Sequence, residues 1–196
     1  MTDKERFINL LMMAAGNRRG FRDFMEWLED TDFFEAPASS KYHGSSEGML
    51  CKHSLNVHGR MQSRQAECKA RGIRPESCIV APLLHDICKV NFYVKDGEKY
   101  KYNNNLWLPV GHGERSVMLI QQHMTLTEEE MVAIRWHMGA YDDAAKGGSR
   151  TLSEVFKKYP LALMLHLSDM EAAYLDEAEE QTCKTEQSSA TNAEQK

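Results

Sequence analysis

The sequence predicts an all-α protein, a compact helical bundle that carries one small β-hairpin. Apolar residues recur three and four positions apart along most of the chain, as Phe7, Leu10 and Ala14 do near its start, and this is the spacing of one helix face. Alternation typical of strands is convincing only in FYVKDGEKYKY, where Asp96-Gly97 is a hairpin turn signal. With 196 residues, 42% of them hydrophobic, the chain is long enough to enclose a substantial core as one domain.

Helix start and stop signals place the elements of the N-terminal half. Thr2 and Asp3 supply a cap for the first helix, and Gly20 separates it from a second. Pro37, several serines and Gly44 predict a loop over residues 32–46. The helices expected next span residues 47–71, ended by Gly72, and residues 75–90, where Pro82 marks a kink or a late start.

The residue pattern of the C-terminal half predicts the hairpin, four helices and a polar tail. The hairpin is expected over residues 92–102, and the helices over residues 112–124, 128–138, 152–158 and 160–178. Thr127 and Glu130 form a capping box ahead of the second of these helices, and Pro160 separates the last two. Residues 181–196 are polar and expected to be disordered, which leaves a single domain over residues 1–180.

Charge and cysteine content restrict the environment and the partners. A formal net charge of -5 argues against a dominant electrostatic grip on duplex nucleic acid. The five cysteines have no paired spacing, as expected where thiols stay reduced. No apolar run approaches the ~20 residues that span a bilayer, and the first residues do not resemble a signal peptide. We therefore expect a cytoplasmic protein that binds no membrane.

The stretch LLHDICKV, residues 83–90, places titratable side chains inside an otherwise apolar segment. On a helix the neighbours His85 and Asp86 lie about 100° apart, so an imidazole nitrogen and a carboxylate oxygen can converge on one ion. The pair alone is weak evidence, since buried polar groups usually just satisfy hydrogen bonds. Four further titratable residues also lie in or beside apolar stretches: His53, His112, His137 and Asp169. A shared metal ion would offset the cost of burying all of them.

In order and context, four of these residues resemble the ligand set of the HD-domain metal-dependent phosphohydrolases. That family has a histidine, a distant His-Asp pair and a later aspartate, all on helices, and the matching residues here are His53, His85, Asp86 and Asp169. LLHDICKV is similar to the family's LLHDIGK, with Cys88 where glycine is common. The resemblance implies an HD-type helical bundle in which the four residues bind metal.

The most similar subgroup includes exoribonucleases that trim RNA from its 3′ end. In that subgroup a Pro-Ala-Ser/Ala loop and a histidine precede the first ligand, and APASSKYHGSSEGMLCKH supplies such a loop with His43 in the corresponding place. The subgroup often has two adjacent histidines where this chain has His43-Gly44, and this chain shows no extra nucleic-acid-binding domain. The resemblance covers about residues 34–175.

The resemblance also implies the chemistry of the site. Mixed nitrogen and oxygen ligands suit Mn, Fe, Co, Ni, Zn or Mg, and such an ion activates water and polarises a phosphoryl oxygen. His112 and His137 are similar to the additional histidines of family members that bind two metal ions, in which the aspartate of the pair, here Asp86, bridges both. The alternative is that these two histidines bind substrate phosphate. One or two divalent ions are therefore expected.

Several residues are candidates for contact with the substrate. Lys89 lies one helical turn after Asp86, where its ammonium can contact a phosphate or orient the carboxylate; a solvated surface lysine is the other reading. Further candidate phosphate contacts are Arg115, Ser116 and, by resemblance, His43. His166, one turn before Asp169, either fixes that ligand or only packs.

The expected function is hydrolysis of a phosphate ester, with Asp86 and Lys89 as the catalytic residues. The partner is a small phosphorylated substrate, a nucleotide or a related compound, that fits between helices. Two alternatives stay open: a phosphodiesterase or 3′-exonuclease on short oligonucleotides or cyclic nucleotides, and a sensor that binds nucleotide without turnover. The ligand set does not separate phosphomonoesters from phosphodiesters, because the same activated water serves both.

Overall fold

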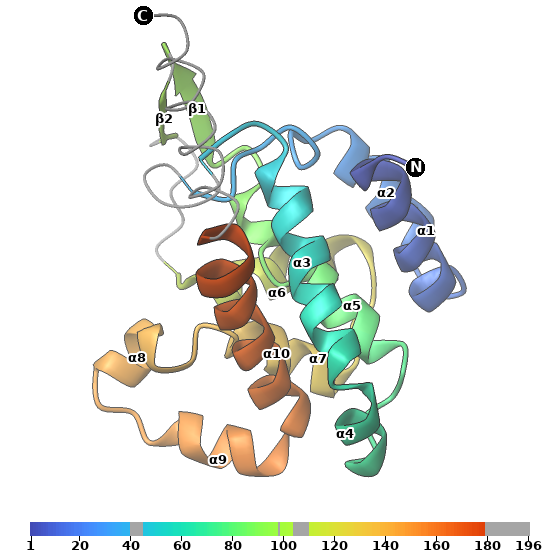
Figure 1. Ribbon diagram of the computed structural model, residues 1–196, viewed down its shortest axis with the longest axis vertical. Helices are drawn as coiled ribbons and strands as arrows, with labels where there is room; N and C mark the ends of the chain where they lie inside the picture. The colour runs from blue at the N-terminus through green and yellow to red at the C-terminus, as the bar shows by residue number, and fades with distance from the viewer. Residues whose placement is uncertain (40–44, 98, 104–109, 179–196) are drawn as a thin grey trace, which may run out of the picture.

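The computed structural model of the protein describes residues 1–39, 45–97, 99–103 and 110–178, which form helices joined by short turns (Figure 1). The α-helices are α1 (Asp3–Ala15), α2 (Phe21–Glu29), α3 (Met49–Ser63), α4 (Gln65–Ala70), α5 (Ser77–Leu84), α6 (His112–His123), α7 (Glu128–Arg135), α8 (Asp143–Lys146), α9 (Thr151–Lys158) and α10 (Pro160–Glu171). The 3-10 turns η1 (Ile87–Lys89) and η3 (Gly139–Tyr141) and the π-helical turn η4 (Ala172–Asp176) complete the helical segments. The predicted all-α fold is confirmed.

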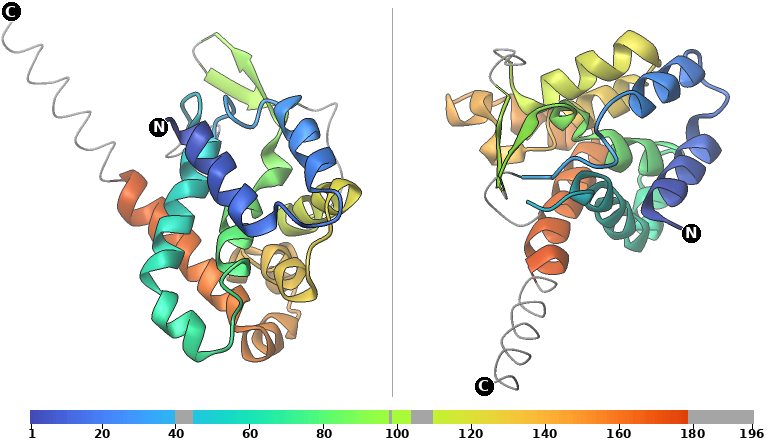
Figure 2. Two further views of the ribbon diagram at one scale, coloured as in Figure 1. Left: turned by 90° about the vertical axis from the view of Figure 1, so that its right-hand side faces the viewer. Right: turned by 90° about the horizontal axis from the view of Figure 1, so that it is seen from above.

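Helices α3, α5, α7 and α10 surround the centre of the molecule. In Figures 1 and 2, α3 and α10 run side by side, and α1 lies across the bundle near the N-terminus. Helix α3 packs against α5 and α10, while α7 packs against α6 and α10. Their apolar faces bury side chains completely, among them Leu50, Leu83 and Leu165. Among the described helices, none has the length and apolar character needed to cross a membrane.

The predicted hairpin is confirmed as the two-stranded antiparallel sheet of the described residues. Strand β1 (Tyr93–Asp96) pairs with β2 (Lys99–Tyr102), and the register places Tyr93 opposite Tyr102. The hairpin projects from the bundle at the top of Figure 1. Only Tyr93 of the two strands is buried, so the base of the hairpin is anchored while its tip stays exposed.

The prediction of a single helix over residues 47–71 is wrong, because this segment is divided into α3 and α4 at Arg64. The Ser63 hydroxyl and the Arg64 guanidinium both donate to the carbonyl of Arg60. The Arg64 amide instead bonds to the carbonyl of Met61, which tightens the last turn of α3. Side-chain donors that compete for a backbone carbonyl commonly interrupt a helix in this way.

The helix predicted over residues 75–90 is also wrong at its C-terminal end. Helix α5 passes through Pro82 but ends at Leu84, and Asp86 adopts φ -104° and ψ 19°. The His85 ring donates from Nδ1 to the Pro82 carbonyl at 2.8 Å, which is the acceptor that the Asp86 amide would use in a continuing helix. The motif LLHDICKV is therefore a helix end followed by a 3-10 turn.

The remaining elements follow the prediction closely. Thr127 and Glu130 form the predicted capping box of α7, and Pro160 begins α10 as its first residue. Helix α7 ends at Arg135, three residues earlier than expected, and the last predicted helix changes from α to π geometry at Ala172. Between α7 and α9, η3 and the short helix α8 occupy a segment for which no element was predicted. The predicted disordered tail, residues 181–196, lies outside the described residues.

Glu130 connects three separate parts of the bundle. Its fully buried carboxylate accepts two hydrogen bonds from Arg18, at 2.6 and 2.7 Å, and one from Ser77 at 2.7 Å. Burial acts to raise the pKa of Glu130, but these donors and the Thr127 amide outweigh it and hold the pKa below its usual value. The α1–α2 turn and the first turn of α5 are thereby tied to the first turn of α7.

We predict that Glu130→Gln destabilises the fold by about 3 kcal/mol, because it removes the charge that compensates the largely buried Arg18. Chemical unfolding measures the loss. The control is Glu154→Gln, which removes an exposed pair with Lys157 and should change stability by less than about 0.5 kcal/mol. Equal stability of the two variants would contradict the structural role of Glu130.

A second prediction concerns His58, which is buried in α3 with both ring nitrogens lacking hydrogen-bond partners among the described residues. Burial, with the nearby charge of Arg6, lowers the pKa of His58 to about 4. An unfolded histidine titrates near 6.5. The contribution of neutral His58 to the free energy of unfolding should therefore be complete above about pH 6.5, and up to about 3 kcal/mol should be lost as the pH falls toward 4. Unfolding curves of His58→Leu should lack this part of the acid dependence. Parallel pH profiles for the two proteins would overturn this account.

Candidate metal centre

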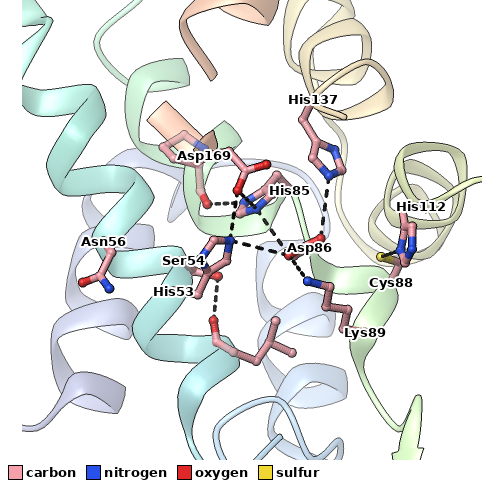
Figure 3. A network of polar contacts seen from close by, with 12 residues as sticks. His53, Ser54, Asn56, His85, Asp86, Cys88, Lys89, His112, His137 and Asp169 are labelled. Atoms are coloured by element: carbon pink, nitrogen blue, oxygen red, sulfur yellow. Dashed lines mark hydrogen bonds and ion pairs between the residues drawn. The ribbon is translucent and has the colours of Figure 1, made fainter. Parts of the chain in front are cut away.

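The described helices bring five of the predicted ligands to one place. His53 extends from α3, His85 and Asp86 follow the end of α5, His137 follows the end of α7, and Asp169 lies on α10. Figure 3 shows that all five side chains point toward one another. Segments far apart in the sequence therefore build one cluster inside the bundle.

The distances within the cluster are those of a shared coordination centre. His53 Nε2 lies 3.1 Å from Asp169 Oδ1 and 3.7 Å from Asp86 Oδ2. His85 Nε2 lies 3.5 Å from Asp86 Oδ2 and 3.7 Å from Asp169 Oδ1. His137 Nε2 lies 3.7 Å from the other oxygen of Asp86, Oδ1. Two overlapping groups, each with its donor atoms within 4.8 Å of one another, share His85: His53–His85–Asp169 and His85–Asp86–His137.

Two of the histidines are held in a defined tautomer. His85 Nδ1 donates to the Pro82 carbonyl at 2.8 Å, and His137 Nδ1 donates to the Ile134 carbonyl at 2.7 Å. A carbonyl only accepts, so each Nδ1 carries a hydrogen, and in the neutral tautomer of either ring the Nε2 lone pair faces the cluster. These bonds also end α5 and α7 just where the ligands are needed.

The cluster fits a metal ion better than it fits a purely structural network. His85 is 0% exposed and His137 is 1% exposed, and their Nε2 atoms have no hydrogen-bond partner among the described residues. Buried polar atoms are normally paired, and leaving one unpaired is costly. A divalent ion bound by imidazole nitrogens and carboxylate oxygens would satisfy both lone pairs.

The ionisation of the two carboxylates and of His137 suits metal binding, whereas that of His53 opposes it. Burial acts to raise the pKa of Asp86 and of Asp169, but the charge of Lys89 beside Asp86 and the hydrogen bond from His53 to Asp169 outweigh it and hold both pKa values below the usual range, so both carboxyls are ionised. Burial lowers the pKa of His137 to about 4, so its ring is neutral at pH 7. For His53, burial opposes protonation, but Asp169 and Glu177 raise its pKa to about 10. A bound cation would have to displace that proton.

Glu177 is a site residue that the sequence reasoning missed. Its carboxylate accepts from His53 Nδ1 at 2.7 Å and is 4% exposed. Asn56 Nδ2 donates to the same oxygen at 3.3 Å. Such a carboxylate fixes the ring of a metal-binding histidine and raises its basicity. Glu177 follows the π-helical turn η4, whose extra residue changes the face on which later side chains lie, so α-helical periodicity could not place it here.

Lys89 contacts the cluster from the side of the cavity. Its Nζ lies 2.6 Å from Asp86 Oδ2, and its side chain is 18% exposed. Burial alone would lower the pKa of Lys89, but the Asp86 carboxylate outweighs it and raises the pKa above the usual value. Lys89 is therefore a fixed positive charge beside Asp86. The alternative of a solvated surface lysine is wrong.

His112 does not join the two groups of donor atoms found among the described residues. Its Nδ1 lies 3.4 Å from the Cys88 sulfur, and Figure 3 shows both residues to one side of the cluster. Burial raises the pKa of the Cys88 thiol to about 12, so the thiol stays protonated. His112 nevertheless lines the same cavity as the cluster. Its role as a ligand stays a prediction, and contact with substrate is the role that this position favours.

The other predicted phosphate contacts lie further away. Ser116 is fully buried, and its hydroxyl accepts the Cys88 amide hydrogen at 3.1 Å, so it supports η1 from within the core. The Arg115 guanidinium lies 5.0 Å from the centre of the Phe92 ring and lines a hollow next to the main cavity. His43 lies outside the described residues.

His166 supports the cluster through His137. Its Nδ1 lies 2.7 Å from the His137 carbonyl, and no bond from it to Asp169 is found in the described part of the chain. Gly139 has φ +55°, and a Cβ atom there would lie 2.4 Å from the His166 ring. Glycine is therefore required for the turn that follows His137.

A cavity of ≈ 560 Å³ opens above the cluster, which is within the size range of small-molecule sites. The residues that line it include Lys89, all the cluster residues except His85, and tyrosines from the hairpin and from η4. A small molecule that enters this cavity reaches the cluster directly.

We predict that Glu177→Gln weakens binding of Mn²⁺ or Zn²⁺ by roughly 10- to 100-fold, because the His53 ring loses its anionic partner. Competition with a chromogenic chelator measures the affinity. The matched control is Glu171→Gln, a carboxylate at the end of α10 that pairs with Arg64 and should leave the affinity unchanged. Equal affinities for wild type and Glu177→Gln would show that Glu177 does not serve the site.

Comparison with known proteins adds no assignment to this geometry. No family model, no curated protein and no solved structure matches the chain. The function must therefore be inferred from the cluster itself and from the order of its motifs in the sequence.

Proposed function

We propose that the protein is a metal-dependent phosphohydrolase that cleaves a phosphate ester of a nucleotide or a related small substrate. The observation that carries this proposal is the cluster of three imidazole Nε2 atoms and two carboxylates, two of whose nitrogens are buried without a partner. The order of His53, the His85-Asp86 pair and Asp169 resembles that of the HD-domain phosphohydrolases. The convergence of these residues in the fold and their order in the sequence thus support the same function.

The residues of the cluster suit hydrolysis by water. A divalent ion held there would lower the pKa of a bound water and polarise a phosphoryl oxygen. Asp86 has one oxygen facing His53 and His85 and the other facing His137, so its carboxylate can serve one ion or bridge two. Mn, Fe, Co, Ni, Zn and Mg all accept such mixed nitrogen and oxygen ligands.

Lys89 supplies the charge that a phosphate substrate requires. Its ammonium lines the cavity beside Asp86, and its raised pKa keeps it protonated. It therefore acts as a fixed cation for a phosphate oxygen and not as a proton acceptor. A positive charge that is already in place where negative charge develops in the transition state makes one of the largest contributions to catalysis.

We predict different effects for Asp86→Asn and Lys89→Met. Asp86→Asn should lower both bound metal and phosphate release, the latter by on the order of three powers of ten, because it removes an anionic ligand. Lys89→Met should keep the metal but lower the rate or the substrate affinity by roughly 10- to 1000-fold. Elemental analysis measures the metal, and activity is measured as phosphate released from nucleoside monophosphates and, by chromatography, as nucleoside monophosphates formed from cyclic nucleotides and short RNA.

The control for both variants is Glu154→Gln on the exposed face of α9, which should match wild type. If the metal-loaded wild type neither releases phosphate from the monophosphates nor cleaves the cyclic nucleotides or RNA with Mn²⁺, Co²⁺, Ni²⁺ or Mg²⁺, the hydrolase proposal fails. Binding of nucleotide without turnover would then favour the sensor.

A further inference from the structure

Aromatic side chains line the cavity above the cluster. Tyr93 and Tyr102 come from the base of the hairpin, and Tyr174 comes from η4 at the end of α10. Tyr102 is 52% exposed and Tyr174 is 62% exposed. Large exposed rings beside a polar site mark a surface that a ligand can cover.

The Tyr102 ring is held in place before any ligand arrives. It lies across the sheet from Tyr93, with ring centres 5.6 Å apart, and Phe92 contacts it edge-on at 5.4 Å. Tyr93 is itself buried, so this aromatic group is anchored to the bundle. A ring that is already ordered loses little conformational entropy when a ligand stacks on it.

Charged and aromatic side chains line the same cavity. Lys89, Asp86 and Asp169 line it together with the two exposed tyrosines, Tyr102 and Tyr174. A matching ligand therefore has an anionic end and a flat, unsaturated end. Among phosphate esters, nucleotides combine a phosphate with a planar base. Every base can stack on an aromatic side chain, because each has a flat π face.

We propose that the site selects nucleoside phosphates over sugar or polyol phosphates by stacking the base on Tyr102, with Tyr174 contacting it from the η4 wall. The inference rests on the proposed function for the position of the phosphate, and it adds the part of the substrate that is recognised. Tyr102 and Tyr174 are specificity-determining residues in this account. They take no part in bond cleavage.

The test is a binding measurement by isothermal titration calorimetry on the Mn²⁺-loaded full chain with three probes: adenosine 5′-monophosphate, uridine 5′-monophosphate and ribose 5-phosphate. We expect both nucleotides to bind on the order of tenfold tighter than ribose 5-phosphate, the contribution of one base–aromatic stack. Tyr102→Ala and Tyr174→Ala should each reduce this preference, and Tyr102→Phe should restore it. Metal content should stay unchanged in all of them.

The matched control is Tyr100→Ala. Tyr100 lies on the same face of β2 as Tyr102, two residues along the strand, but it does not line the cavity. This variant tests damage to the hairpin and should keep the preference for nucleotides. Loss of the preference in Tyr100→Ala to the same degree as in Tyr102→Ala would overturn the stacking role.

The outcomes separate this inference from the proposed function. Equal binding of ribose 5-phosphate and both nucleotides by wild type, with phosphate released from all three, would refute base recognition and leave the hydrolase intact. Tyr102-dependent binding of nucleotides without any phosphate release would support base recognition and refute the hydrolase.

Discussion

Ionised carboxylates and imidazole rings lie together inside a helical core, and this arrangement can hold a metal cation. Asp86 and Asp169 face the same histidines, and both are held ionised. In the described residues Lys89 and a protonated His53 supply positive charge, yet the Nε2 atoms of His85 and His137 remain buried and unpaired. A divalent ion would satisfy both nitrogens and both carboxylates together.

The bundle is arranged so that helix ends deliver these side chains. His85 and His137 use the same device, in which the ring donates to the carbonyl three residues earlier, ends the helix, and turns Nε2 toward the cluster. Residues further out maintain this arrangement: His166 bonds to the carbonyl of His137, and Glu177 fixes the ring of His53. The local chain geometry and the orientation of the ligands therefore have one cause.

Much of the fold, and part of the site, could be predicted from the sequence. Periodicity, caps and the Asp96-Gly97 turn are local signals, so they gave the helices and the hairpin. His53, His85, Asp86, His137 and Asp169 were found because polar residues in apolar stretches need a shared partner. The end of α5 and the π-helical turn before Glu177 depend on side-chain bonds and tertiary packing that periodicity does not record. The contact of His112 with Cys88 likewise depends on how α6 packs against η1.

The central claim is that the cluster binds a divalent metal ion, and a crystal structure with Mn²⁺, located by its anomalous scattering, tests it most directly. The account predicts an anomalous peak inside the bundle, about 2.0 to 2.3 Å from the Nε2 atoms of His53 and His85 and from oxygens of Asp86 and Asp169. A second peak between Asp86 and His137 would establish a dinuclear centre. A fully ordered cluster without a peak, its Nε2 atoms bonded only to water at saturating Mn²⁺, would contradict the claim.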